Sequence, residues 1–151
     1  MPYRKSKKQS DASSTDQKPP DEPTFFLDRN LAYKKFPTAL RAAGIKVVLH
    51  DDYFPIDAKD VDWLPKVGQN GWIVLTKDDK IRYHALERQA LMGSGVGAFI
   101  LASGELTAHE WASIFIKALP AVKKFLHKTK RPFIARITRS GAISIVDKGT
   151  P

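Results

Sequence analysis

The sequence of 151 residues contains no cysteine. This absence excludes disulfide scaffolds, thiolate nucleophiles, and zinc or iron–sulfur sites built from cysteine ligands. Long apolar runs are also missing, since no stretch approaches the ~20 apolar residues that a membrane helix needs. No apolar segment follows the basic residues at the start of the chain. We therefore expect a cytoplasmic protein with no secretory signal and no membrane partner.

Common cofactor motifs are absent as well. The sequence has neither GxGxxG nor GxxxxGK[ST], so dinucleotide-binding and P-loop assignments have no support. The four histidines are scattered and form neither HExxH nor a similar zinc-binding spacing. Any chemistry of this protein must therefore be inferred from other features of the sequence.

Basic residues outnumber acidic ones. Lys and Arg total 25 and Asp and Glu total 16, which gives a net charge of +9. Residues 1–23 carry five basic and four acidic side chains, so the excess lies in the remainder of the chain, at 20 against 12. Such an excess favours polyanionic partners, but ribosomal proteins, nucleases and nucleic-acid-binding regulators all share it.

Composition divides the chain into one domain and two tails. Residues 1–23 are polar, contain four prolines and have almost nothing apolar, so they are predicted to be a disordered tail. A single folded domain is expected over 24–147, followed by a short tail at 148–151. The length of the chain is sufficient for a substantial core.

Within the domain, short apolar runs alternate with amphipathic segments. Buried strands are predicted at 24–27, 45–49, 72–75 and 98–101, and helices at about 36–43, 58–68, 79–91 and from 107 onward. The last helix has the clearest start, because Thr107 and Glu110 form a capping box. Weak alternation around Ser140 and Gly141 suggests a C-terminal β-hairpin over 133–146. Together these elements predict an α/β fold, a three-layer α/β/α sandwich with a mainly parallel central sheet.

Acidic residues stand where two of the predicted strands end. Asp28 follows the first strand, Asp78 and Asp79 follow the third, and Asp60 opens the helix before it. In an open α/β sheet, ligands bind beyond the carboxyl ends of the strands. If the second strand lies on the far side of the first, these carboxylates converge in one cleft. Their mutual repulsion then favours a bound Mg²⁺ or Mn²⁺, which prefers hard oxygen ligands.

Each acid also has an ordinary structural explanation. Asp28 could cap the next turn, and Asp60 could complement the dipole of its helix. Asp78 could be an N-cap and Asp79 a first-turn carboxylate. The joint placement after two core strands is more specific than any single residue.

Three segments resemble the small prokaryotic PIN-like family, which is related to VapC-type toxin nucleases. They are Phe26-Leu27-Asp28-Arg29-Asn30-Leu31, Asp60-Val61-Asp62-Trp63-Leu64 and Ile73-Val74-Leu75-Thr76-Lys77-Asp78. The resemblance implies an α/β/α sandwich that binds Mg²⁺ or Mn²⁺ through acidic residues and cleaves RNA. It also implies the role of toxin in a toxin–antitoxin pair, with a cognate antitoxin as partner; a homodimer is compatible with it.

The resemblance also assigns roles to individual positions. The metal-binding and catalytic acids are Asp28, Asp60 and Asp78, with Asp79 as a less secure fourth. Asn30 is the polar residue beside the first acid, and Thr76 would orient the loop or a metal-bound water. Members of the family often have Glu at the position of Asp60. Arg29 stands directly beside Asp28 and could weaken metal binding or contact the scissile phosphate. Glu87 is expected more than two turns along its helix, in a salt bridge or a cap.

Basic residues supply candidates for RNA binding. Lys77, Lys80 and Arg82 flank the predicted cleft. The segment 111–146 carries eight basic residues and no acidic one, and its helical part places Lys117, Lys124 and Lys128 on one face. This segment is either an ordinary solvated face or a phosphate-binding patch. Trp63 and Trp111 have the spacing of core residues.

Two other function classes compete with a nuclease. One is a non-catalytic nucleic-acid-binding or regulatory module, which would use the basic surface and need no metal. The other is a phosphatase-like or receiver-like protein, in which an acid after the first strand is phosphorylated. The first strand lacks the paired acids that receiver domains carry, so this assignment has little support.

Overall fold

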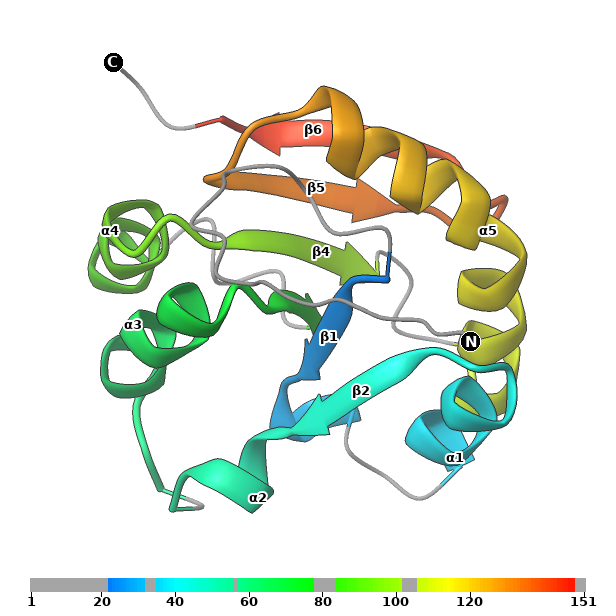
Figure 1. Cartoon of the computed structure of the whole chain (residues 1–151), viewed down its shortest axis with the longest axis horizontal. Helices are drawn as coiled ribbons and strands as arrows, with labels where there is room; N and C mark the ends of the chain where they lie inside the picture. The colour runs from blue at the N-terminus through cyan, green and yellow to red at the C-terminus, as the bar shows by residue number, and fades with distance from the viewer. Residues whose placement is uncertain (1–21, 32–34, 56, 78–83, 102–105, 149–151) are drawn as a thin grey trace, which may run out of the picture.

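A computed structural model describes residues 22–31, 35–55, 57–77, 84–101 and 106–148. Its centre is a six-stranded sheet with the strand order β2-β1-β3-β4-β5-β6 (Figure 1). Five strands are parallel and β6 is antiparallel to β5. The strands are β1 (Thr24–Leu27), β2 (Lys46–Leu49), β3 (Ile73–Thr76), β4 (Gly97–Leu101), β5 (Phe133–Ile137) and β6 (Ile143–Asp147).

Helices cover both faces of the sheet, so the predicted three-layer sandwich is confirmed. The α1 and α5 helices pack together on one face, and α3 and α4 pack together on the other (Figure 1). None of the helices in the described ranges is both long enough and apolar enough to cross a lipid bilayer. The helices are α1 (Lys35–Ala42), α2 (His50–Tyr53), α3 (Asp60–Asn70), α4 (Ala85–Gly93), α5 (Ala108–Lys128) and a 3₁₀ turn, η2 (Arg29–Leu31).

Alternating residues of the parallel strands build two hydrophobic cores, one on each face. In β1, Phe25 packs edge-on against Phe115 of α5, with ring centroids 5.1 Å apart. Phe26 points to the other face, where its ring lies 4.9 Å from that of Trp63 in α3. Since β1 is covered on both sides, it is a continuous apolar run rather than an alternating one. Trp63 and Trp111 are both buried, as predicted.

The capping box of α5 is present as the sequence predicts. The Thr107 hydroxyl accepts a hydrogen bond from the Glu110 amide at 3.1 Å, and the Glu110 carboxylate accepts one from the Thr107 amide at 2.8 Å. The Thr107 amide, and to a smaller extent the Thr107 hydroxyl, lower the pKa of the Glu110 carboxyl below its ordinary value. The box satisfies two amides that the helix itself leaves without partners.

Replacing Thr107 with Ala should lower the free energy of unfolding by about 1 kcal/mol, because it removes the N-cap acceptor. Urea denaturation followed by circular dichroism would measure this change. Ser113→Ala is the matched control, since Ser113 is an exposed residue within the same helix and also loses a hydroxyl. Equal stability of the two variants would show that the cap contributes nothing.

The capping box has an expected pH dependence. A carboxylate with a lowered pKa stabilises the fold above its unfolded pKa, and this contribution is lost as the pH falls through the folded value. The stability difference between wild type and Glu110→Gln, which keeps a side-chain acceptor but loses the charge, should therefore shrink below about pH 4. A difference that grew on acidification would contradict this account.

Several boundaries differ from those predicted. The β2 strand lies at the edge of the sheet and is only partly buried, whereas a buried strand was predicted. The predicted polar loop after it begins with α2, whose first residue, His50, is buried. The α4 helix begins at Ala85 with His84 as its N-cap, so Glu87 lies in the first turn rather than more than two turns along. There it lies 3.5 Å from His84 Nδ1, in the salt-bridge role that was expected.

The predicted tails lie almost entirely outside the described residues. Of the segment 1–23, the structure describes Glu22 and Pro23, and of 148–151 it describes Lys148. The strand predicted at Thr24 begins there, and the C-terminal β-hairpin is confirmed as β5 and β6.

Candidate functional site

The candidate site lies at the carboxyl end of the sheet, where β1 and β3 finish side by side. Asp28 follows β1, and its amide continues the ladder by donating to the Leu75 carbonyl at 3.0 Å. Its Oδ2 accepts a 2.8 Å hydrogen bond from the Thr76 hydroxyl, and its Oδ1 accepts a 2.7 Å bond from the Arg29 amide. Thr76 is 1% exposed, whereas Asp28 is partly exposed. The carboxylate is therefore held in a fixed orientation at a surface that solvent reaches.

Asn30 connects the two strand ends through its amide side chain. Its Nδ2 donates to Thr76 Oγ1 at 3.3 Å, and its Oδ1 accepts from the Lys77 amide at 3.3 Å. The turn η2 places Asn30 here, because its helical geometry returns the chain over the end of β3. Two of the three segments that carry the family resemblance are thus joined by one hydrogen-bonded network, whereas the sequence predicted only that they lie close together.

The other predicted site residues are described in part or not at all. Asp60 is the first residue of α3, as predicted. Its side chain is not among those that the structure describes. Arg29 is exposed on η2, and Lys77 is partly exposed after β3. The convergence of all four acids stays a prediction. Outside the described residues lie Asp78, Asp79, Lys80 and Arg82.

The donor chemistry at Asp28 suits a hard divalent cation. A carboxylate has about four acceptor positions, so its bonds to Thr76 and Arg29 are compatible with cation binding. Thr76 and Asn30 add only oxygen and amide groups, with no soft ligand. In the part of the chain that the structure describes, no three His, Asp or Glu side chains lie close enough together to hold an ion. The side chains of Asp60 and of the residues directly after Lys77 are not among those described.

The sheet register places a row of mostly polar positions at this end of the sheet. Thr76 pairs with Ile100, Ile100 with Arg136, and Arg136 with Ser144. On the other side, Asp28 and His50 directly follow the paired residues Leu27 and Leu49. The row across all six strands is therefore His50, Asp28, Thr76, Ile100, Arg136 and Ser144.

Sequence reasoning did not assign His50 or Arg136 to this site. His50 is 1% exposed, its Nδ1 lies 2.9 Å from Asp51 Oδ1, and its ring packs against Phe26 and Trp63. It anchors the end of β2 to the α3 side of the sheet. For Arg136, the only sequence signal is a single basic residue that interrupts the apolar run of β5.

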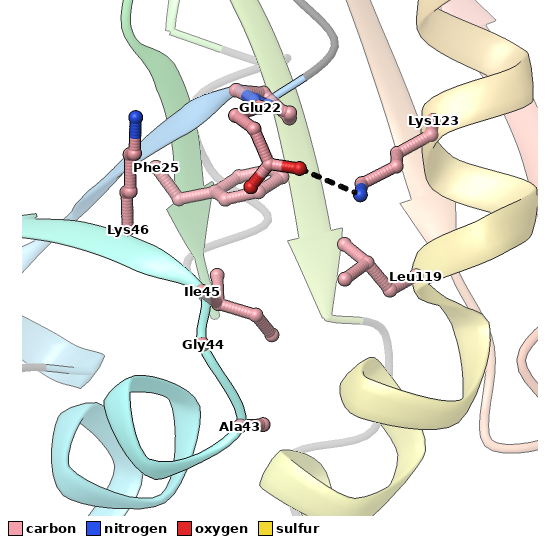
Figure 2. A pocket seen from close by; sticks show the side chains of 9 residues that line it. Glu22, Phe25, Ala43, Gly44, Ile45, Lys46, Leu119 and Lys123 are labelled. Atoms are coloured by element: carbon pink, nitrogen blue, oxygen red, sulfur yellow. Dashed lines mark hydrogen bonds and ion pairs between the residues drawn. The ribbon is translucent and has the colours of Figure 1, made fainter. Parts of the chain in front are cut away.

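A pocket of about 190 Å³ lies at the opposite, amino end of the strands. Phe25 and Ile45 line it, and a 3.4 Å ion pair between Glu22 and Lys123 spans its mouth (Figure 2). Leu119 of α5 closes one side. Because Asp28 stands at the other end of β1, this pocket is not part of the candidate site.

The basic face of α5 is also separate from the candidate site. Lys117, Lys124 and Lys128 are exposed. However, α5 packs on the face of the sheet to which Leu27 points, and the next residue, Asp28, bonds to Thr76 on the opposite face. Any RNA bound by α5 would have to pass around the sheet to reach Asp28.

Another basic residue of the segment 111–146 has a structural role. Arg131 is partly buried and donates to the Gly71 carbonyl at 3.1 Å. Burial lowers the pKa of its guanidinium from the ordinary value. The hydrogen bond connects the start of β5 to the end of α3. This side chain therefore stabilises the fold rather than binding a ligand.

Comparison with known proteins agrees with the architecture of the sheet. The model of the PIN like domain family matches residues 23–103, more than half of the chain. The chain is also 27% identical over 126 residues to a Mycobacterium tuberculosis (strain ATCC 25618 / H37Rv) protein named "Putative ribonuclease VapC45". That alignment covers 81% of this chain and 91% of the relative. No solved structure matches. Because the matched residues include β1, α3, β3 and the network around Asp28, the chain belongs to the PIN-like domain family.

Proposed function

We propose that this protein is an endoribonuclease that depends on Mg²⁺ or Mn²⁺ and acts as the toxin of a toxin–antitoxin pair. The observation that carries the proposal is the network in which Thr76 and the Arg29 amide fix the Asp28 carboxylate at the carboxyl end of the sheet. Membership of the PIN-like family supports it, as does the relative whose name describes a ribonuclease.

The proposed metal-binding and catalytic acids are Asp28, Asp60, Asp78 and Asp79. A bound divalent ion would lower the pKa of a water molecule and neutralise charge that develops on the phosphate. The chain itself positions the first acid: the Thr76 hydroxyl donates to it, and Asn30 bonds to Thr76 and the Lys77 amide. Thr76 is buried and bonded on both sides, so the network leaves the carboxylate little freedom to turn.

The proposed RNA contacts surround this acid. Arg29 is exposed on η2 directly beside Asp28, where its guanidinium can reach a phosphate. Lys77 follows the buried end of β3. Lys80 and Arg82 complete the proposed set. Since phosphate contacts carry little sequence information, these residues would position the strand rather than select the cleaved sequence.

The test is cleavage of cellular RNA by the purified protein. We expect fragments to appear with Mn²⁺ or Mg²⁺, to stop forming when EDTA is added, and to form again when the ion is restored in excess. Cleavage that EDTA does not affect would contradict the metal dependence. Intact RNA under every metal condition would contradict the nuclease assignment.

The exposed lysines of α5 favour a second candidate, a nucleic-acid-binding module without catalysis. Their face of the molecule lies away from Asp28, so RNA could bind there with no metal. The same experiment separates the two functions. A non-catalytic module would retain RNA binding in EDTA, and cleavage would never be observed.

The toxin assignment implies a cognate antitoxin in the same compartment, which we propose to be the cytoplasm. An antitoxin would suppress the RNA cleavage described above. Inhibition by a co-expressed small protein from the neighbouring gene would support this partner, whereas undiminished cleavage in its presence would exclude that protein.

A further inference from the structure

Arg136 is a cation that is only partly exposed to solvent. Its Nε is inaccessible to solvent and has no hydrogen-bond partner among the described residues. An unsatisfied buried donor destabilises a fold. Such donors are rare in native proteins, and an ion or ligand that completes the bond is one ordinary explanation.

The described acidic side chains around β5 have partners other than Arg136. Asp147 of β6 forms a two-bond ion pair with Arg88 of α4, one of the bonds being 2.8 Å long. Glu87 pairs with His84. Among the described residues, the charge of Arg136 in this apolar strand therefore has no acidic ion-pair partner.

The register places Arg136 on the same face and in the same row as the candidate site. Ile134, two residues earlier in β5, packs in the core under α3 and α4, so Arg136 extends from that face. Only Ile100 separates it from Thr76 in the row. With strands about 4.8 Å apart, Arg136 lies roughly 10 Å from Thr76 and roughly 14 Å from Asp28 along the sheet. An extended Arg side chain spans much of such a gap.

We propose that Arg136 binds a phosphate of the RNA strand held at Asp28. The inference rests on the proposed function, because it names a further contact to the same substrate. The planar fork of a guanidinium matches a phosphate through two parallel hydrogen bonds. Asp28 after β1 and Arg136 in β5 would then hold one RNA strand across the carboxyl end of the sheet.

The test measures RNA affinity without cleavage. Full-length wild type, Arg136→Met, Arg136→Lys and Arg139→Met would be titrated in EDTA against a short fluorescein-labelled single-stranded RNA of random sequence, at several salt concentrations. Arg139 is the matched control, since it is exposed in the turn between β5 and β6 and loses the same charge. Thermal unfolding would be recorded for every variant.

Arg136→Met should weaken RNA binding at least about tenfold, the loss expected for a charge-assisted hydrogen bond. The slope of log K against log salt should fall by about 0.7, the value for one lost phosphate contact to a single strand. Arg136→Lys should restore the slope and only part of the affinity. Arg136→Met should unfold at the wild-type temperature or above it, because it removes an unsatisfied buried donor.

Three results would overturn the inference. The first is Arg136→Met binding RNA as tightly as Arg139→Met. The second is a fall in both melting temperature and RNA affinity in Arg136→Met that is fully absent in Arg136→Lys, because this result would indicate a structural role. The third is wild type that binds no RNA. Binding in EDTA without cleavage under any metal condition would remove the ribonuclease proposal but leave Arg136 as a phosphate contact, so the two failures are distinguishable.

Discussion

Replacing Asp28 with Asn should abolish RNA cleavage while the protein stays folded. The neutral amide loses the charge that would hold a divalent ion, and metal catalysis contributes several kcal/mol to transition-state stabilisation. At about 1.4 kcal/mol for each factor of ten, the rate should fall at least about a thousandfold. The fold should survive, because Asp28 is only partly buried and its Asn replacement has nearly the same shape.

Metal binding gives a readout of this variant that does not depend on activity. A ligand that binds only the native state raises the melting temperature. Mn²⁺ should therefore raise the melting temperature of wild type and have no such effect on Asp28→Asn. Asp52→Asn is the matched control, since Asp52 is an exposed acid of α2. Cleavage by Asp28→Asn within about tenfold of the Asp52→Asn rate would exclude Asp28 from the catalytic set.

Replacing Gly68 with Ala should give the largest loss of stability from a single methyl group. A Cβ at Gly68 would lie 2.1 Å from the backbone oxygen of Ser94, at the end of α4. A backbone carbonyl cannot rotate away as a flexible side chain can, so α3 and α4 would have to separate. Their separation would expose Val67 and Leu91, both fully buried. We expect a loss of about 3 kcal/mol or more, at the upper end of overpacking effects.

Gly93 is the matched control for this substitution. It is also a helical glycine, in α4, but a Cβ there would meet no atom within 4 Å. Gly93→Ala should be neutral or stabilising by up to about 1 kcal/mol, because Ala favours the helix over Gly. Thermal unfolding would separate the two by roughly 10 °C. Similar melting temperatures would show that α3 and α4 tolerate a wider spacing.

Much of the fold could be predicted because its signals are local. The run 24–27, the motif Thr107–Glu110 and the apolar segment 98–101 each indicated an element near its observed place. Errors arose where the signal was not local. The apolar run of β2 resembles that of a central strand, yet its position at the edge of the sheet leaves it partly exposed. The start of α4 depends on its cap, and no capping motif marks His84.

The candidate site could be predicted only in part. Asp28 directly follows a buried strand, and Thr76 is the last residue of another. The apolar residues before each of them therefore indicate where they lie. The bond between them depends on the parallel register of β1 and β3, which the predicted strand order allows but does not fix. Arg136 was predicted only as one of the eight basic residues of the segment 111–146, and nothing local assigned it to this site, because a lone basic residue in a strand usually faces solvent.

By itself, the sequence determined the order of strands and helices, the absence of cysteine chemistry and the acids that stand at strand ends. These follow from periodicity and composition, which act over a few residues. Only the tertiary structure decided that Asp28, Thr76 and Arg136 stand in one row on one face, because strands far apart in the chain pair in a single register. A shift of one residue in any strand would send its side chain to the opposite face, so the row exists only once the sheet has formed.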